Sequence, residues 1–591
     1  MTQNIVEDRV WFPGAPADAV SYSRTVDEAS GLRVSVLAAA GSALPELMVR
    51  GSGAGLQLEA GADGDGPFTL SLSLPLRDPV TLWTPGSEVP HGTMPASWAD
   101  ARRISALDGV AIGCLLTTGD RAALTYGAET EGAPLSVRGG VVEETAELLV
   151  AFETERPGAV LRVRVDLTGG AFAESVRGIG AWLGRDVPAS SSRDERPVFC
   201  TWYYAHQDVR QDDLQRQAER AAGLGFGTVI VDDGWQTGEH ERGYGSAGDW
   251  RPDGRKLPDP RGLTSRLESL GLATMWWIGT PFLGERSDAY GNPALPILYE
   301  VPELDAAVLD VRSPAARRHI TDRAIALLAE AGGDGFKLDF LERFARPVET
   351  PPPADADHDS AEDAALTLVR ELVERARQVR PELMVELREP YIGADIRALA
   401  SMVRVEDCPV SPVENRVGIA DLRLVAPGTA VHSDPVMWAE SDSPSRVAHQ
   451  LLSAIMGVPQ VSADLIGMRH DHAEVLAFWL GFWTRNADTI LHGRFLPRRP
   501  DLSYPVMEAQ GESAVVIVRY APVAVRIPAG EWRSIAIANA DQEEEVPILG
   551  AVGGYRLEVR DARGRLVSDE RTDRAPAFAR IPSGGLATLT R

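Results

Sequence analysis

The first 190 residues alternate apolar and polar positions in short runs, which Gly, Pro and Asp interrupt. Such alternation places the apolar side chains on one face of a β-strand. A helical spacing of apolar residues is absent there, apart from a short stretch at residues 176–183. The runs that we interpret as strands include LRVSVLAA, FTLSLSLPL, VAIGCLLTT, AELLVAF and AVLRVRVDL. The pattern predicts an N-terminal β-sandwich domain over residues 1–190.

The pattern changes at residue 197, after a small and polar segment. Short apolar runs now alternate with amphipathic stretches that are long enough for helices. We expect strands at PVFCTWYY, GTVIVDDG, ATMWWIG, GFKLDFL, LMVELRE, MVRVED, AVHSDPVMW and VPQVSADL. Eight strands alternating with helices predict a catalytic (β/α)8 TIM barrel over residues 197–500. A doubly wound open sheet is the rival fold, but no GxGxxG phosphate turn follows a strand.

After residue 503 the chain returns to strand-like runs: AVVIVRYA, VAVRIPA, RSIAIANA, YRLEVRDA and ATLTR. They predict a small C-terminal β-sandwich domain over residues 503–591. The expected fold class is therefore α/β, with a TIM barrel between two β-sandwich domains.

Composition narrows the classes of partner. The chain has 85 Asp and Glu against 59 Lys and Arg, a formal net charge of −26. Such a chain repels nucleic acids and anionic membranes, so we expect neither as a partner. Three cysteines cannot build a disulfide framework, and neither a secretory signal nor a long apolar segment is evident. We expect a cytoplasmic protein; whether it forms a homo-oligomer stays open.

Acidic residues recur at the ends of six predicted barrel strands, where barrel enzymes place their catalytic groups. A single Asp after a strand is usually a turn or cap residue, but six strand ends on one rim indicate a ligand or a cation. The acidic residues at these ends are Asp232, Asp233, Asp339, Glu386, Glu389, Glu406, Asp407, Asp434 and Asp464.

Lys337 and Asp339 are two residues apart on the fourth predicted strand, so their side chains share a face. A neighbouring lysine keeps a carboxylate ionised. An ionised and positioned carboxylate is what a glycosidic nucleophile requires. The alternative is a buried ion pair that only stabilises the barrel.

Several strings, in this order, resemble glycoside hydrolase family 36, which includes α-galactosidases and the raffinose and stachyose synthases. They are CTWYYAHQDV, VIVDDGWQ, GDW, FKLDF and RVEDCP, and HSDPVMW resembles the late barrel of the synthase-type branch. The resemblance covers roughly residues 197–495.

The resemblance implies retaining cleavage of an α-glycoside through two carboxylates. By position, Asp339 matches the nucleophile and Asp407 the acid/base. Glu406 points to the opposite face if its strand is regular, and is the weaker candidate.

The resemblance also assigns substrate-binding residues. Asp232, Asp233 and Lys337 match residues that contact sugar hydroxyls, and Trp202 and Trp235 match aromatic walls of the first subsite. The GDW string at residues 248–250 lies in the loop where the family also has GDW.

One segment departs from the family. After the fifth strand the chain reads VELREPYIGADIR, without the family's glycine cluster, and Arg388 or Arg397 could replace the family's arginine. The string WWIGTPFLG also differs, which leaves galactose itself open. We expect Arg388 at the barrel mouth in contact with the sugar; the alternative is pairing with an acidic neighbour.

The expected function is retaining hydrolysis of a carbohydrate substrate, most simply an α-galactoside, without a cofactor. The alternatives are a transglycosylase of the raffinose synthase type, an α-glycosidase for another sugar, a carbohydrate-binding protein without catalysis, and a metal-dependent hydrolase. For the last, His470 and His472 lack an obvious third ligand, so no metal is expected.

Overall fold

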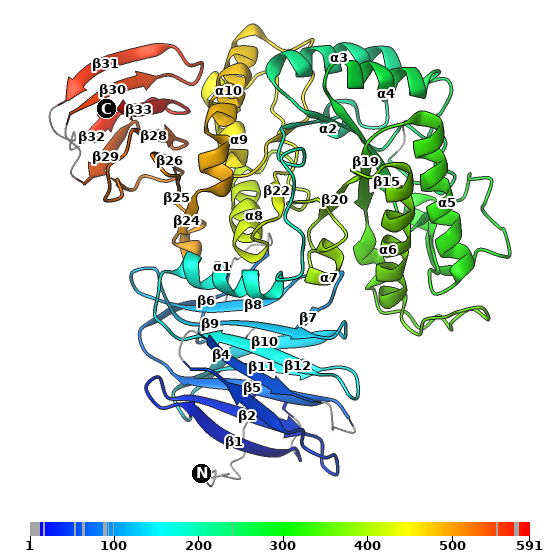
Figure 1. Cartoon of the computed structure of the whole chain (residues 1–591), viewed down its shortest axis with the longest axis vertical. Coiled ribbons are helices and arrows are strands. Elements are labelled where there is room, and N and C mark those ends of the chain that lie inside the picture. The colour runs from blue at the N-terminus through cyan, green and yellow to red at the C-terminus, as the bar shows by residue number, and fades with distance from the viewer. Residues whose placement is uncertain are drawn as a thin grey trace.

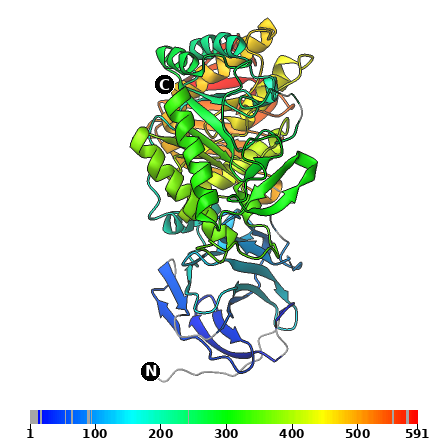
Figure 2. The same cartoon turned by 90° about the vertical axis from the view of Figure 1, so that its right-hand side faces the viewer.

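The chain folds into an N-terminal pair of sheets, a central barrel and a C-terminal group of strands (Figure 1). The computed structural model describes residues 12–15, 18–52, 55–61, 66–86, 92, 94–98, 100–238, 240, 242–550, 554–572 and 578–591. In the view turned by 90°, the N-terminal sheets again lie at one end of the molecule and the barrel above them (Figure 2).

The N-terminal part contains two six-stranded antiparallel sheets, as the alternating runs predict. One sheet has the order β1 (Val20–Asp27), β2 (Leu32–Ala38), β5 (Phe68–Pro75), β11 (Glu147–Thr154), β10 (Leu135–Val142) and β7 (Arg102–Ile104). The other has the order β3 (Leu47–Arg50), β4 (Leu56–Ala60), β12 (Leu161–Asp166), β9 (Arg121–Thr130), β8 (Ala111–Thr117) and β6 (Pro79–Trp83). Apolar side chains from both sheets form one buried cluster, which is the sandwich core.

Helix α1 (Phe172–Leu183) lies between the N-terminal sheets and the barrel (Figure 1). It is longer than the stretch predicted from the sequence. Its Gly180 packs against the end of α8 (Pro412–Val425), where an added Cβ would lie 2.6 Å from the Leu424 carbonyl oxygen. Only glycine permits this close approach of the two helices.

The barrel strands run parallel and fall within the eight predicted segments. Their order is β22 (Ala430–His432), β21 (Met402–Arg404), β20 (Met384–Arg388), β19 (Gly335–Asp339), β15 (Ala273–Gly279), β14 (Thr228–Val231), β13 (Val198–Cys200) and β23 (Gln460–Val461). A parallel bridge between His432 and Val458 joins the two ends of this series. The TIM-barrel prediction is therefore confirmed, and the open-sheet alternative is wrong.

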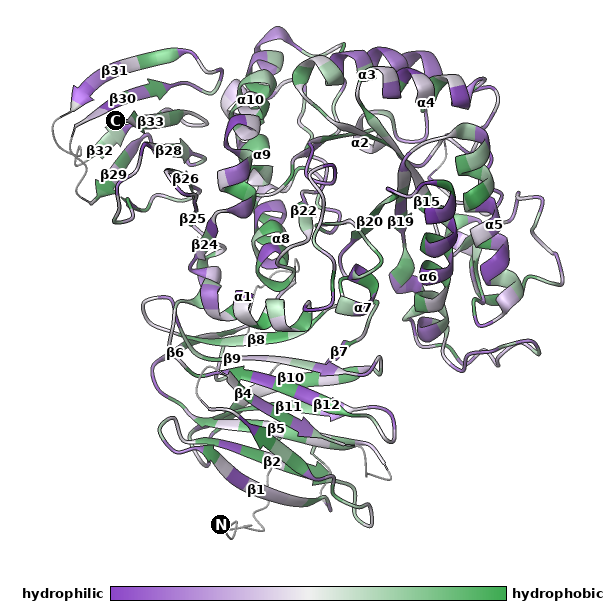
Figure 3. Ribbon diagram, in the orientation of Figure 1, coloured by the Kyte–Doolittle hydropathy of each residue, from purple (hydrophilic) through white to green (hydrophobic). Residues whose placement is uncertain are grey.

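Helices surround the strands, and their polar sides face outward, as the purple colour of much of α3 and α6 shows (Figure 3). Besides α1 and α8 they are α2 (Trp202–Ala205), α3 (Gln211–Leu224), α4 (Pro260–Ser269), α5 (Pro314–Ala331), α6 (Ala361–Val379), α7 (Ala394–Arg397), α9 (Pro444–Ala454) and α10 (His470–His492). Serine hydroxyls cap the first turns of four of them and so define where these helices begin. These serines are Ser313, Ser360, Ser411 and Ser443.

A small antiparallel sheet, which the sequence pattern did not reveal, interrupts the barrel between β15 and α5. Its order is β16 (Phe282–Gly284), β18 (Ala306–Leu309) and β17 (Ile297–Val301). Short 3-10 turns occur at η2 (Pro302–Leu304), η3 (Leu341–Phe344) and η4 (Pro500–Leu502). The turn η3 follows β19 directly and brings Glu342 to the strand end.

The C-terminal strands form a seven-stranded and a three-stranded sheet around their own apolar cluster. The larger has the order β24 (Arg494–Arg498), β25 (Val506–Gln510), β26 (Ala514–Arg519), β28 (Ser534–Asn539), β33 (Leu586–Thr590), β30 (Tyr555–Arg560) and β31 (Leu566–Thr572). The smaller contains β27 (Val525–Arg526), β29 (Glu545–Leu549) and β32 (Phe578–Arg580). Because α10 leads straight into β24, this sheet includes residues from before position 503.

Within the described ranges, no helix combines the length and the apolar character needed to cross a membrane.

Candidate active site

Three charged side chains meet inside the barrel at the ends of β14 and β19. Lys337 Nζ donates to Asp232 Oδ2 over 2.7 Å and lies 4.0 Å from Asp339 Oδ2. All three side chains are buried. Burial by itself lowers the pKa of Lys337, but Asp232 and Asp339 outweigh it and the pKa is raised. Lys337 is therefore a fixed positive charge between two carboxylates.

Asp339 receives hydrogen bonds on both carboxylate oxygens. Oδ1 accepts from Arg388 Nε (2.7 Å) and from the Phe340 backbone N–H (2.8 Å). Oδ2 accepts from Trp277 Nε1 over 2.9 Å. Burial raises the pKa of this carboxyl, but Arg388 and Lys337 outweigh burial and hold the pKa below its usual range. Asp339 is thus an anion with a fixed orientation.

The Arg388 side chain, on β20, is only 6% exposed, and its donors point to protein groups. Besides Asp339, it contacts both carboxylate oxygens of Glu406, at 2.8 and 2.6 Å. It also donates to Glu342 Oε1 (3.1 Å) and to the Glu389 carbonyl oxygen (2.7 Å). Arg388 therefore lies beside the strand ends, as expected. It pairs with acidic neighbours, which was the alternative to contact with a sugar.

Asp407 and Glu406 lie in the loop after β21, which ends at Arg404. Strand alternation therefore does not apply to them, and the expectation that Glu406 points to the opposite face, which assumed a regular strand, has no basis here. Asp407 Oδ1 accepts from Arg404 Nη2 over 2.7 Å, and its side chain is 51% exposed. Burial raises the pKa of Asp407, but Arg404 outweighs this and lowers it. Burial raises the pKa of Glu406.

Asp232 and Asp233, after β14, are both buried and bonded to protein groups. Asp233 accepts from Gln207 Nε2 (2.7 Å) and from Gln236 Nε2 (2.6 Å). Burial raises the pKa of Asp233 to about 6. Asp232 accepts from Lys337, as described above, and from Cys200 Sγ at 3.3 Å. Lys337 thus links Asp232 to Asp339, whereas the Asp233 side chain is held by two glutamine amides and its N–H donates to Asp232 Oδ1.

The two aromatic candidates differ in their exposure. Trp202, at the start of α2, is partly exposed and packs edge-on against His206. Trp235 is completely buried; its Nε1 donates to the Trp277 carbonyl oxygen and its ring packs against Trp276. Trp235 therefore packs against β15, and its side chain has no exposed face to offer a sugar. Gly234, directly before it, has a φ of +113°, a conformation that favours glycine.

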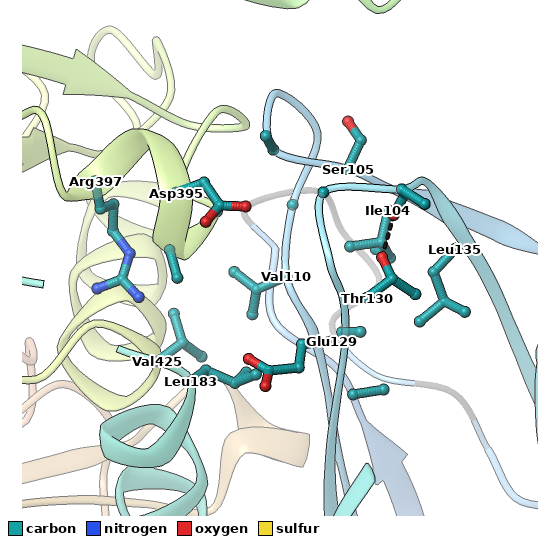
Figure 4. Close-up of a pocket in the computed structure, with 18 residues that line it drawn as sticks. Ile104, Ser105, Val110, Glu129, Thr130, Leu135, Leu183, Asp395, Arg397 and Val425 are labelled. Carbon is teal, nitrogen blue, oxygen red and sulfur yellow. Dashed lines mark hydrogen bonds between the residues drawn. The ribbon is translucent and has the colours of Figure 1, made fainter. Parts of the chain in front are cut away.

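Arg397, the other candidate for the family's arginine, lies away from Asp339. It is buried on α7, and its Nε donates to the Ile392 carbonyl oxygen over 2.8 Å. It lines a pocket of about 110 Å³ between the N-terminal sheets and the barrel (Figure 4). There it faces Leu183 and Val425 rather than the strand-end carboxylates. Of the two arginines, only Arg388 reaches the candidate site.

The GDW string and the two histidines of the metal alternative make other contacts. Asp249 Oδ2 accepts from the Asp288 backbone N–H, and Trp250 is buried. His472 Nε2 lies 2.8 Å from the Asp442 carbonyl oxygen, whereas His470 is exposed. In the described part of the chain, no group of three or more His, Cys, Asp or Glu side chains is arranged to hold a metal ion.

Sequence reasoning missed Trp277, Glu342, Tyr391 and the role of Arg404. Trp277 is paired in register with Lys337, and Gly279 with Asp339. Because paired residues of neighbouring strands share a face, strand parity could have identified Trp277 as a neighbour of the nucleophile candidate. Tyr391, whose hydroxyl donates to the Leu338 carbonyl oxygen, lies after the strand and carried no such signal.

Comparison with known proteins gives a consistent picture. The family model described as Melibiase matches residues 184–387. The α-galactosidase AgaA of Geobacillus stearothermophilus is 34% identical over 98 residues, which is 16% of this chain and 13% of the relative. The α-galactosidase of Escherichia coli is 30% identical over 151 residues, 24% of this chain and 21% of the relative. The sequence matches thus span about a quarter or less of these curated relatives.

Solved structures extend the likeness to the whole fold. The crystal structure of the family 36 α-galactosidase AgaA of Geobacillus stearothermophilus superposes with a TM-score of 0.65 at 15% identity, covering 100% of this chain and 86% of that one. The α-galactosidase TtGalA of Thermus thermophilus, solved in complex with stachyose, superposes with a TM-score of 0.55 at 18% identity, covering 76% of this chain and 97% of that one. At these identities the superpositions establish the shared fold.

Proposed function

This chain is similar to the α-galactosidases of glycoside hydrolase family 36 in sequence and in fold, and we propose that it is a glycoside hydrolase acting on galactosides by a retaining mechanism. The observation that carries the proposal is the setting of Asp339. It is an anion at the end of a barrel strand, held by Arg388, Lys337 and Trp277. A fixed, ionised carboxylate at this rim is what attack on an anomeric carbon requires.

In the proposed reaction, Asp339 attacks the anomeric carbon while Asp407 gives a proton to the leaving oxygen. The glycosidic C–O bond breaks, and a covalent glycosyl ester forms on Asp339. Asp407, now ionised, removes a proton from water, which attacks the same carbon and releases the sugar. The partial exposure of the Asp407 side chain is suited to a group that must meet both the leaving group and water.

The proposed substrate is an α-galactoside, in keeping with the activities named for the similar proteins. TtGalA binds stachyose, which makes a galactose-terminated oligosaccharide a suitable first substrate. The chain from the end of β20 onward lacks the glycine cluster of the family pattern, and Arg388 is the candidate for the family's arginine. We therefore propose that the sugar pocket is shaped differently on that side.

A panel of chromogenic α- and β-glycosides tests the proposal. We expect hydrolysis of an α-galactoside with retention of configuration at the anomeric carbon. NMR of the first-formed sugar measures that configuration. The variant Asp339→Asn should lose about 10³-fold or more in turnover while it keeps its melting temperature near that of the wild type. Near-normal activity in this folded variant would overturn the assignment of the nucleophile. A sugar product that appears only when an acceptor is added would instead identify a transglycosylase.

A further inference from the structure

Tyr244 lies in the long loop between β14 and α4, and its ring packs against aromatic side chains beside Asp339. The centroid of its ring is 4.7 Å from that of Phe282, with 14° between the planes, so these two rings are stacked. It is 5.8 Å from the ring centroid of Trp277 and 5.2 Å from that of Phe340. Both of these residues donate a hydrogen bond to Asp339. The ring of Tyr244 therefore packs directly against two residues that hold the candidate nucleophile.

The backbone around Tyr244 is also fixed. Its N–H donates to the Leu304 carbonyl oxygen over 2.8 Å. The carbonyl oxygen of Gly243, directly before it, accepts from Gln207 Nε2 over 3.1 Å. The same Gln207 nitrogen donates to Asp233 Oδ2 over 2.7 Å. The loop thus fixes Tyr244 next to Asp233 as well as next to the candidate nucleophile.

The Tyr244 hydroxyl lies among the carboxylates at the strand ends. Burial raises its pKa, and the negative charges of nearby carboxylates raise the pKa further. Those carboxylates are Asp233, Asp339, Asp232 and Asp407. The hydroxyl therefore keeps its proton and can donate it in a hydrogen bond.

This hydroxyl is not engaged by the protein. Among the residues that the structure describes, none forms a hydrogen bond with it, and the side chain is partly exposed. Two other tyrosines near the site are engaged: the Tyr203 hydroxyl donates to Asp434 Oδ2, and the Tyr391 hydroxyl donates to a backbone carbonyl oxygen. Tyr244 thus differs from both in having a donor to offer a ligand.

A sugar bound at these strand ends needs donors as well as acceptors. Each sugar hydroxyl has one proton to give and lone pairs that accept. Asp232 and Asp233, when ionised, can only accept. Lys337, Arg388 and Trp277 are donors, but each already donates to a protein carboxylate. A phenolic O–H without a protein partner supplies the donor that these groups do not.

We propose that Tyr244 is a substrate-binding residue, whose hydroxyl donates a hydrogen bond to one hydroxyl of the sugar at the cleavage site. This inference rests on the proposed function. The strings that resemble family 36 end at Gln236 and resume at Gly248, so the resemblance assigns no role to Tyr244.

The variant Tyr244→Phe tests the inference, because it removes one oxygen and keeps the packing of the ring. The experiment measures kcat/KM of the wild type and the variant on a nitrophenyl α-galactoside and on analogues that each lack one sugar hydroxyl. On the parent substrate the variant should lose about 2- to 12-fold, as expected for a neutral hydrogen bond. On the analogue that lacks the bonded hydroxyl, the two proteins should be equally active, since neither can form the bond.

Tyr22→Phe is the matched control. The Tyr22 hydroxyl, on β1, donates to the Pro45 carbonyl oxygen over 3.0 Å, so kcat/KM should match that of the wild type on every substrate. If Tyr244→Phe shows no loss on the parent substrate, or the same loss on every analogue, the inference alone is wrong. A wild-type chain that cleaves no α-galactoside would overturn the proposed function and this inference together.

Discussion

Arg388 Nε lies 2.7 Å from Asp339 Oδ1, so an arginine from the neighbouring barrel strand holds the candidate nucleophile. The same guanidinium contacts Glu406 and Glu342. Arg388 therefore stabilises the ionised form of Asp339, and its donors are already engaged by protein groups.

The variant Arg388→Gln should move the acidic limb of the kcat/KM profile to higher pH. A nucleophile must be ionised, and activity is lost as the pH falls through its pKa. Because Arg388 lowers the pKa of Asp339, its removal raises that pKa, by about 1–3 units. The loss of kcat/KM in this variant should be equal for substrates with different sugars. Arg185→Gln, which removes an exposed ion pair with Glu129, is the control and should leave the profile unchanged.

A contrary result would be informative. An Arg388→Gln variant with an unmoved acidic limb and a loss that depends on the sugar would show that Arg388 contacts the substrate. The segment after β20 would then determine specificity directly.

Trp277→Phe should reduce kcat/KM by roughly 10- to 100-fold, because hydrogen bonds to charged groups contribute about 1.5–3 kcal/mol. The lost bond is the one from the indole Nε1 to Asp339 Oδ2. Its neighbour Trp276 donates instead to the Gly332 carbonyl oxygen. Trp276→Phe is therefore a matched control, expected to lower the melting temperature without a comparable loss of activity. Equal losses of activity in both variants would argue against a specific role for Trp277.

Asp407→Ala should slow the cleavage of substrates with poor leaving groups by about 10²–10⁴-fold and spare those with very good leaving groups. Only a poor leaving group needs the proton. Glu406→Ala is the matched comparison, since Glu406 is the adjacent carboxyl and is bound to Arg388. If Glu406→Ala shows the dependence on the leaving group and Asp407→Ala does not, the acid/base has been assigned to the wrong neighbour.

Glu342→Gln should stabilise the protein relative to the wild type more at pH 8 than at pH 5. Burial raises the pKa of Glu342 to about 7, despite Arg388. A carboxyl whose folded-state pKa is raised costs stability as the pH rises from its unfolded value, near 4.3, through its folded value. The glutamine lacks this cost. Melting curves at the two pH values measure the difference; a pH-independent difference would contradict the raised pKa.

The sequence by itself determined the architecture and the two candidate carboxylates. Eight apolar runs separated by amphipathic stretches were sufficient for the barrel, because strand and helix periodicities are local properties of the chain. Lys337 and Asp339 could be placed on one interior face for the same reason. The likeness to family 36 rested on short strings such as DDGW and KLD at strand ends, where residues near in sequence stay near in space.

Tertiary structure alone decided which partners these groups meet. Arg388 and Asp339 are 49 residues apart, and their contact exists because β19 and β20 are neighbours in a particular register. The loop after β21 places Glu406 against Arg388 and Asp407 against Arg404, a pairing of partners that the sequence does not specify. Trp235 is buried, and it is Trp277 whose indole N–H donates to Asp339. The proton affinity of a buried carboxyl depends on such distant charges, which no local pattern along the chain can encode.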